Sequence, residues 1–441
     1  MNPREAAVLS LNSAFKNGRF VNLELDSTIK KYGFEDKDKS FYTRLLYGTV
    51  EKKLTLDWYL SQISKTALSE IEPLVRCILE TALYQIFEMD RVPDSAACNE
   101  ATELVKKLCP GSYAGFVNAI LRNTVRKKTS LHTELQALTG ISGVSIRHSI
   151  PLWICQKWES DYGQGSAEQI AHGFEGIPPH LTLHINTLKT TADDYLAKLD
   201  PSLCPRKIGD SLITLSGSAP VESLPGFDEG LFFIQDESSA LCAALVSASV
   251  AGISAPTVID TCACPGGKTF AIAIANADCG TLYSFDLHAN RLSLIERGTK
   301  RLGITSVKTE ARDARKPDAA LFGKADAVLC DVPCSGLGIL AKKPDIRYKN
   351  EEDIARLPEI GLDILCKSAQ YVKPGGALIY STCTLCKAEN EDNVAAFLEK
   401  NPDFVPAKLA FRGAVNGTKT FFPQTDGTDG FFVAKFIRNK E

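Results

Sequence analysis

A glycine-bearing turn between a predicted strand and a predicted helix is the first stretch of this sequence that could hold a reactive cofactor. Residues 258–270 read Val-Ile-Asp-Thr-Cys-Ala-Cys-Pro-Gly-Gly-Lys-Thr-Phe, which predicts a buried strand ending at Asp260, a tight turn over 265–267 and a helix from about Lys268. Because neither glycine has a Cβ, backbone can approach a ligand closely there. The unpaired N–H groups of a helix N-terminus suit an acidic or polar ligand. The turn therefore predicts a nucleotide-type cofactor site.

Three cofactor classes compete for this turn. A P-loop requires Gly-x-x-x-x-Gly-Lys-Ser/Thr, and Cys262 stands where its first glycine belongs. A dinucleotide turn requires Gly-x-Gly-x-x-Gly, whereas these glycines are adjacent. S-adenosylmethionine (SAM) needs an acid for its ribose, and Asp286 ends the next predicted strand about twenty residues later. One such acid alone could be a helix N-cap. Asp260, Asp286 and Asp331 all end strands, and Asp313 follows the strand nearest the expected adenine, so SAM is favoured.

Two cysteines follow later predicted strands and indicate a reaction. Cys334 lies in Asp331-Val-Pro-Cys-Ser-Gly336 and Cys383 in Ser381-Thr-Cys-Thr384, at the strand ends where an open α/β sheet binds its ligands. Methyl transfer to oxygen or nitrogen needs no thiol, but C5 of a pyrimidine is a poor nucleophile until a thiolate adds to C6. Asp331 is placed to hydrogen-bond the N3/N4 edge of cytosine. Chemistry alone does not decide which cysteine attacks.

Other roles for these cysteines remain open at this point. A cysteine at a strand end is most often a small buried side chain. Cys383-Thr-Leu-Cys386 is also a Cys-x-x-Cys pair, which suits redox chemistry or half a zinc site. Because Cys262-Ala-Cys264 has the wrong spacing for a second zinc pair, no metal is expected.

Composition indicates an ordinary globular protein of two or three domains. The chain has 441 residues, 44% of them hydrophobic and 23% charged. Its formal net charge of −3 gives no global attraction to nucleic acid or to an anionic membrane, so a polyanion would have to meet local basic patches. The 14 cysteines are scattered in apolar contexts, which favours a reduced, cytoplasmic protein. No apolar run of about 20 residues occurs, so no membrane contact is expected, and a monomer is assumed by default.

Helical periodicity predicts an all-α domain over residues 1–130, with breaks at Gly33, Gly48, Pro93 and 110–111 and a last helix over 113–126. Residues 131–148 are polar and weakly periodic, which predicts a linker. Residues 149–235 predict a small α/β region, either an RNA-binding platform or an extension of the next domain. Its expected helices end at 162 and cover 191–199, and its strands cover 179–186, 211–215 and 231–235.

Residues 236–441 alternate strand and helix, which predicts a Rossmann-like α/β domain whose parallel sheet is covered on both faces. Its strands are expected at 257–260, 281–286, 325–331 and 377–382, with an antiparallel last strand at 430–437.

The helical segment resembles the NusB family of RNA-binding domains, through Phe41–Val50, Ile86–Pro93 and Gly115–Arg122. The region from 235 to 435 resembles the Sun/Fmu family of SAM-dependent RNA cytosine-5 methyltransferases. It carries Asp260-x-Cys-x-x-Pro-Gly-Gly-Lys268, Asp331-x-Pro-Cys-Ser-Gly336, Lys343-Pro-Asp-Ile-Arg347, Tyr380-Ser-Thr-Cys383, Glu389-Asn-Glu391 and Thr428-Asp-Gly-Phe-Phe432.

A NusB-like head on this catalytic half is the architecture of bacterial 16S rRNA enzymes of that family. The resemblance implies methylation of cytosine 967, in the usual bacterial numbering, on 16S rRNA or an early small-subunit particle. A tRNA methyltransferase with the same catalytic residues, or a non-catalytic RNA-binding assembly factor, remains an alternative.

The resemblance also implies a role for each site residue. Cys383 would be the nucleophile, Cys334 would assist product release, and Asp331 would hydrogen-bond the base. The implied SAM contacts are Cys262, Ala263, Cys264, Pro265, Gly266, Gly267, Lys268, Asp286, Asp313 and Asp331.

Two basic clusters could contact RNA phosphates. The first comprises Arg126, Lys127 and Lys128, at a predicted helix C-terminus where cations also suit the helix dipole. The second follows the Pro-Cys loop and could instead be a solvated loop; it comprises Lys342, Lys343 and Arg347.

Four positions depart from the family pattern. His184 replaces a common Arg, Tyr348 a common Trp, His288 a frequent second acid and Thr384 a more usual Ser. The first of these puts a family RNA or structural contact in doubt.

Overall fold

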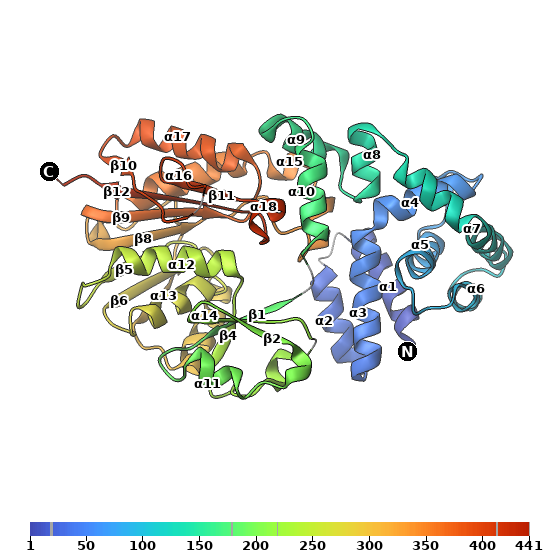
Figure 1. Ribbon diagram of the computed structural model, residues 1–441, viewed down its shortest axis with the longest axis horizontal. Coiled ribbons are helices and arrows are strands. Elements are labelled where there is room, and N and C mark those ends of the chain that lie inside the picture. The colour runs from blue at the N-terminus through green and yellow to red at the C-terminus, as the bar shows by residue number, and fades with distance from the viewer. Residues whose placement is uncertain (18–20, 178–179, 218, 412, 441) are drawn as a thin grey trace. The chain divides into compact units, whose positions relative to one another are not determined.

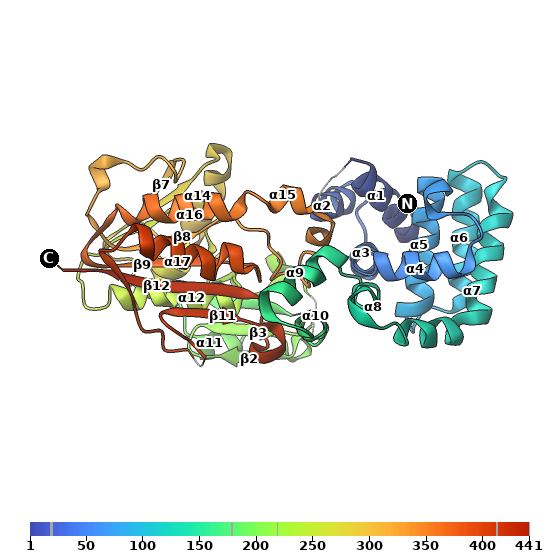
Figure 2. The ribbon, with the colours of Figure 1, turned by 90° about the horizontal axis from the view of Figure 1, so that it is seen from above.

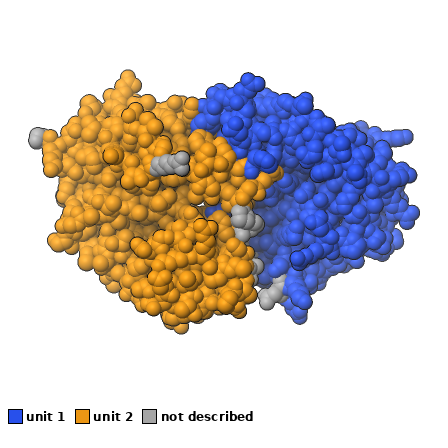
Figure 3. Space-filling model, in the orientation of Figure 1, with its two compact units in different colours: residues 1–172, 342–349 blue, residues 173–341, 350–441 orange. Residues whose placement is uncertain are grey.

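The computed structural model describes residues 1–17, 21–177, 180–217, 219–411 and 413–440. The chain forms two compact units (Figure 3), of which the first comprises residues 1–172 with 342–349 and the second residues 173–341 with 350–441. The first unit thus continues past the helical domain expected over 1–130. Among the described residues no helix combines the length and the apolar character needed to span a bilayer.

The described residues of the first unit form helices (Figure 1), with 3-10 turns at Leu68–Glu70 and Pro344–Tyr348. Helix α5 begins after Glu72, whose side chain accepts a hydrogen bond from the Val75 N–H, and Pro73 occupies its first turn. Eleven of its 16 residues are buried, so α5 is the centre of this core. The helices are α1 Pro3–Asn17, α2 Val21–Tyr32, α3 Asp36–Glu51, α4 Lys53–Ile63, α5 Pro73–Glu88, α6 Asp94–Leu108, α7 Tyr113–Gln136, α8 Gly140–Arg147, α9 Leu152–Tyr162 and α10 Ser166–Glu175.

The sequence predicted a helix break at Gly48, but the structure places this residue inside α3. A Cβ on Gly48 would lie 2.0 Å from Cζ of Tyr84 on α5. The glycine therefore permits close approach of two helices, a role that helix propensity alone does not reveal.

Residues 131–148, which the sequence predicted to be a linker, are largely helical. These residues form the end of α7 and the whole of α8. Leu131 and Leu135 lie one helical turn apart and are buried in the core of the unit, which explains why α7 continues through this segment. The polar residues that suggested a linker lie on the exposed face of the helix. Arg126, Lys127 and Lys128 consequently lie in mid-helix, and the helix-dipole explanation for their charge does not apply.

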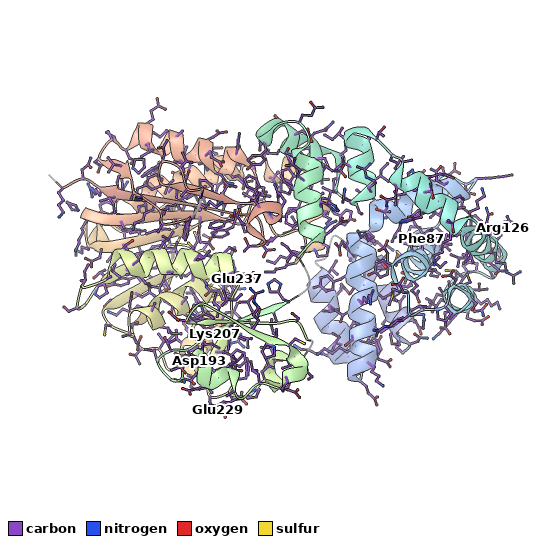
Figure 4. The ribbon with its side chains drawn as sticks, viewed as in Figure 1. Phe87, Arg126, Asp193, Lys207, Glu229 and Glu237 are labelled. Atoms are coloured by element: carbon purple, nitrogen blue, oxygen red, sulfur yellow. The ribbon has the colours of Figure 1, made fainter. Side chains whose placement is uncertain are left out.

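A small antiparallel sheet begins the second unit, in the order β2-β3-β1-β4. Leu183 and Ile185 of β1 pack with Tyr195, Ile213 and Phe232 in its core. The ion pair between Asp193 and Lys207, 2.6 Å, joins α11 to β2 (Figure 4). The elements are β1 Leu181–Ile185, α11 Ala192–Leu196, β2 Pro205–Ile208, β3 Leu212–Leu215 and β4 Phe232–Ile234, with 3-10 turns at Pro201–Leu203 and Val221–Ser223.

Three of these four strands were predicted, although Pro179 of the first expected strand lies outside the described residues. Strand β2 was missed because Pro-Arg-Lys-Ile does not alternate apolar and polar residues.

The rest of the second unit is an eight-stranded sheet in the order β10-β12-β9-β8-β5-β6-β7, with β11 beside β12. The pairs among β5 to β9 are parallel, and β12 runs antiparallel to β9, as predicted. The strands are β5 Thr257–Asp260, β6 Thr281–Asp286, β7 Val307–Ala311, β8 Ala325–Asp331, β9 Val372–Thr382, β10 Phe404–Pro406, β11 Thr418–Phe421 and β12 Phe431–Arg438.

Helices cover both faces of this sheet (Figures 1 and 2). Ala327 and Leu329 of β8 pack with α12, α13 and α14, whereas Val328 and Cys330 pack with α16 and α17. The helices are α12 Glu237–Ser249, α13 Gly267–Ala275, α14 Ala289–Leu302, α15 Glu351–Ile354, α16 Leu357–Ala369, α17 Glu391–Lys400 and α18 Pro423–Asp426; 3-10 turns lie at Ala319–Leu321 and Lys387–Glu389.

Strand β6, which follows β5 in the chain, pairs with one edge of β5, and the chain returns to pair β8 with the other edge. This change of direction makes the carboxyl ends of β5 and β8 the expected ligand crevice.

Candidate active site

The glycine turn has the geometry expected of a close backbone approach. β5 ends at Asp260 and α13 starts at Gly267, which defines the intervening loop, residues 261–266. Gly266 has φ of 112°, and a Cβ there would lie 2.5 Å from the Phe270 ring. The loop is tied to both neighbouring strands, because the N–H of Thr261 donates to Leu329 of β8 (3.0 Å) and that of Ala263 to Phe285 of β6 (2.7 Å).

Asp260 is 1% exposed, and its Oδ2 accepts a hydrogen bond from the Thr269 hydroxyl at 2.8 Å. Its other oxygen, Oδ1, is buried and has no hydrogen-bond partner among the described residues. Burial raises the pKa of Asp260 to about 7. A buried carboxyl with one unsatisfied oxygen below the loop is compatible with a ligand that brings its own polar groups.

The two acids expected to hold adenosine lie at their predicted strand ends. Asp286 is buried at the end of β6, where its Oδ1 accepts the N–H of His288 at 3.0 Å and its Oδ2 lies 3.6 Å from Arg291. Asp313 follows β7 and forms two hydrogen bonds with the Arg315 guanidinium, which holds the pKa of Asp313 below its usual value. His288, which directly precedes α14, is exposed. It replaces the second acid that the family pattern often has at this position.

Lys268 and Asp331 form an ion pair of 2.7 Å at the crevice. The lysine side chain is only 13% exposed. Burial lowers the pKa of Lys268, but the charge and hydrogen bond of Asp331, with smaller effects of Cys242 and Cys383, together raise it above its ordinary value. Oδ1 of Asp331 accepts a hydrogen bond from the Ser381 hydroxyl at 2.7 Å. The carboxylate is therefore oriented from β8, α13 and β9 together.

The structure brings the two predicted catalytic cysteines together. Their Sγ atoms are 3.1 Å apart, and the N–H of Cys383 lies 3.3 Å from Sγ of Cys334. None of the 14 cysteines, all of which are described, forms a disulfide. The described residues contain no cluster of three or more ligands for a metal ion.

Sequence reasoning missed several residues that position the site. Glu389 and Asn390 had been noted only as part of a motif, yet they hydrogen-bond the residues next to both cysteines. Gln235, after β4, had not been singled out; its Oε1 contacts Nδ1 of His184 at 2.7 Å, which requires that nitrogen to carry the proton. His184 is thus a buried side chain stacked on Phe233, where the family pattern has Arg.

The predicted RNA-binding residues have different environments. Arg126 and Lys127 are exposed on α7 (Figure 4 labels Arg126), whereas Lys128 pairs with Asp94 at 3.1 Å. Lys343 is exposed and Lys342 is half-buried.

Arg347 must be removed from this set. It is 3% exposed, and its Nη1 donates to the backbone carbonyls of Glu51, His148 and Ser149 at 3.1 to 3.3 Å. Beside it, the Tyr348 hydroxyl donates to the Val50 carbonyl at 2.6 Å. Both side chains belong to the interior of the first unit, so the Arg347 guanidinium is too buried to contact a phosphate.

A parallel sheet in this strand order, with a glycine turn after β5 and acids at the next strand ends, defines a Rossmann-like methyltransferase domain. Residues 252–437 match the family described as 16S rRNA methyltransferase RsmB/F, residues 1–126 the NusB family, and residues 150–221 the ferredoxin-like domain of RsmF/B-like methyltransferases.

Relatives cover nearly the whole chain. The probable ribosomal RNA small subunit methyltransferase B of Bacillus subtilis is 34% identical over 98% of this chain and 97% of its own. That of Synechocystis is 32% identical over 98% of both. The chain therefore belongs to the RsmB family of ribosomal RNA small-subunit methyltransferases, and the predicted NusB-like and methyltransferase folds are confirmed.

Solved structures agree on the fold. The crystal structure of PH0851 covers 99% of both chains with a TM-score of 0.79 and 23% identity. NSun6 from Pyrococcus horikoshii, solved with SFG, covers 65% of this chain and 97% of its own with a TM-score of 0.57 and 22% identity.

Proposed function

We propose that this protein transfers a methyl group from SAM to C5 of a cytosine in 16S rRNA. The observation that carries the proposal is the pair of thiols, 3.1 Å apart, at the crevice end of the sheet beside the glycine turn. Transfer to oxygen or nitrogen would use neither thiol, whereas C5 chemistry uses a thiolate to activate the ring.

The residues of the crevice fit SAM. We expect the cofactor to be held by the glycine turn and by the strand-end acids predicted from the sequence. Asp286 would contact the ribose, and the protein backbone at Gly266 and at the α13 N-terminus would approach the ligand closely. NSun6 from Pyrococcus horikoshii, which shares this fold, was solved with SFG. When bound, SAM supplies an electrophilic methyl group. The proposed contacts are Cys262, Ala263, Cys264, Pro265, Gly266, Gly267, Lys268, Asp286, Asp313 and Asp331.

The surroundings of the two thiols support Cys383 as the nucleophile. The positive charge of Lys268 interacts with Cys383 as well as with the buried Cys242. Cys334 has the opposite environment: its hydrogen bond to Cys383, its burial and the negative charge of Glu389 raise its pKa well above the ordinary value, against a smaller opposing effect of the Cys383 N–H. We therefore assign the proton of the pair to Cys334.

In the proposed reaction the Cys383 thiolate adds to C6, and the electron pair of the C5–C6 bond moves to C5, which then accepts the methyl group. Loss of the C5 proton to a base and departure of the Cys383 thiolate restore the double bond. Cys334 is close enough to Cys383 to assist this release. Asp331, held by Lys268 and Ser381, can accept hydrogen bonds from the N4 amino group and protonated N3 of the base.

The names of the relatives support small-subunit rRNA as the substrate. By family resemblance the target is cytosine 967 in the usual bacterial numbering. We propose that a monomer acts on the 16S rRNA or an early small-subunit particle.

The test uses the purified chain with SAM labelled in its methyl group and either small-subunit RNA, small-subunit particles or tRNA. We expect label on C5 of one 16S cytosine, mapped by nuclease digestion and mass spectrometry, and no label with Cys383→Ala. Label on tRNA alone would identify a tRNA enzyme. RNA binding without SAM binding would identify an assembly factor and contradict the proposal.

A further inference from the structure

The residues that follow the two cysteines are joined to each other. Ser335, after Cys334, and Thr384, after Cys383, have their hydroxyl oxygens 2.6 Å apart, and both side chains are fully buried. The loop after β8 and the loop after β9 are thus linked one residue away from each thiol.

Glu389 lies against this link from the next turn of the chain. Its Oε2 accepts the N–H of Ser335 at 2.8 Å and its Oε1 accepts the Ser335 hydroxyl at 2.6 Å. Because a serine hydroxyl has one hydrogen, which goes to the carboxylate, the Thr384 hydroxyl must be the donor to Ser335. Glu389 is 2% exposed, so a buried carboxylate fixes both the position and the hydrogen-bond direction of this pair.

Asn390 forms hydrogen bonds with the residues on both sides of Cys383. Its Oδ1 accepts the hydroxyl of Thr382 at 2.5 Å, and its Nδ2 donates to the carbonyl of Thr384 at 2.9 Å. The Tyr380 hydroxyl of β9 donates to the Glu389 carbonyl at 2.6 Å, which ties the same turn back to the sheet. The side-chain amide of Asn390 therefore spans Cys383, and the carboxylate of Glu389 holds the residue after Cys334.

We propose that Glu389 and Asn390 are positioning residues that form a bracket holding the Cys334 loop against the end of β9, so that both thiols reach the same base. The proposal rests on the function proposed above, because it assumes that both thiols act in one reaction. The bracket is asymmetric, because its one negative charge, on Glu389, lies beside Ser335, the residue that follows Cys334.

The first test reads the thiols directly and needs no RNA. Alkylation by iodoacetamide is followed across pH, and each cysteine is scored by peptide mass spectrometry. The titratable groups facing Cys334 are Cys383, Glu389 and Tyr380. In the wild type we expect Cys383 to react at lower pH than Cys334. In Glu389→Gln the profile of Cys334 should shift to lower pH, because the neighbouring negative charge is removed.

The second test measures methyl transfer. Glu389→Gln and Ser335→Ala should lower kcat at least tenfold with little change in KM for RNA, because binding surfaces are untouched. Thr384→Ser keeps the donor hydroxyl and should retain activity within about twofold. Glu391→Gln is the matched control, because one oxygen of this neighbouring acid accepts from Thr420 at 2.6 Å and the other has no hydrogen-bond partner among the described residues. Both readouts of that variant should match the wild type.

The outcomes separate the two proposals. If Glu389→Gln folds with a normal Tm and both its alkylation profile and its kcat equal those of the wild type, the bracket is refuted. If Glu389→Gln does not fold, Ser335→Ala decides, and an unchanged kcat in that variant refutes the bracket. If the wild type transfers no methyl group but the Cys334 profile still shifts in Glu389→Gln, the proposed function fails, whereas the contact of Glu389 with the Cys334 loop is supported.

Discussion

At the scale of single residues, the two thiols differ through their neighbours rather than through their own position. They lie 3.1 Å apart, yet Lys268 interacts with Cys383 and Glu389 with Cys334. The sequence places both cysteines at strand ends but leaves the choice of nucleophile to family resemblance. The negative charge of Glu389, one of the causes that raise the pKa of Cys334, gives a physical reason to propose the same choice.

Asp260 provides a pH-dependent prediction. Its pKa is raised to about 7 in the folded protein from an ordinary 3.8, chiefly by burial, with Asp331 raising it and Lys268 lowering it. A raised pKa means that the folded form holds the proton more tightly, so this contribution to stability is complete below about pH 4 and is lost as pH rises toward 7. The slope should be about 1.4 kcal/mol per pH unit within that window.

The measurement compares wild type and Asp260→Asn by denaturant unfolding between pH 4 and 8. The free energy of unfolding should fall with pH more steeply in the wild type than in the variant, which keeps an acceptor for Thr269 but does not titrate. Parallel curves would contradict the assignment of a raised pKa.

Arg347 gives a second prediction for a single residue. Arg347→Ala would leave three buried carbonyls without their donor, so we expect a loss of about 2–4 kcal/mol in the stability of the first unit. The exposed neighbour Lys343 is the control, and Lys343→Ala should change the Tm by less than about 1 °C. Unchanged stability of Arg347→Ala together with weakened RNA binding would restore the original RNA-contact interpretation.

At the scale of elements, close packing explains features that propensity misreads. Gly48 lies within α3 because the ring of Tyr84 occupies the space of a Cβ. Gly48→Ala should therefore destabilise the helical unit by about 1–3 kcal/mol. Gly115→Ala on α7, where a Cβ would meet nothing within 4 Å, should instead stabilise it by up to about 1 kcal/mol. Thermal unfolding of both variants checks the pair, and an equal effect in the two would argue against the α3–α5 contact.

The elements that the sequence predicted well are those with strong apolar patterns. β5, β6 and β8 are buried on both faces and were placed at their observed bounds, and the strand-end acids followed from them. β2, with Pro-Arg-Lys-Ile, and the continuation of α7 past Arg126 carry weak patterns, and only tertiary burial of Leu131 and Leu135 explains the latter. The bracket was not predictable, since hydrogen bonds between loops far apart in sequence leave no periodicity.

At the scale of the whole molecule, the net charge of −3 leaves RNA affinity to local surfaces. Arg126 and Lys127 are the predicted contacts that remain exposed on α7. The double variant Arg126→Gln/Lys127→Gln should weaken rRNA binding and reduce the slope of log K against log salt by about 1 for each phosphate that is no longer neutralised. Lys106→Gln, which removes an exposed lysine already paired with Glu103 at 2.7 Å, is the control. An unchanged salt slope in the double variant would exclude this face.

In the proposed reaction Cys383 forms a covalent bond to the base and Cys334 assists its release. The most direct measurement incubates Cys334→Ala, Cys383→Ala and the double variant with SAM and substrate rRNA, followed by a denaturing gel. We predict a protein–RNA band that survives denaturation in Cys334→Ala and is absent from both proteins that lack Cys383. A band in Cys383→Ala, lost in the double variant, would contradict the account by making Cys334 the nucleophile.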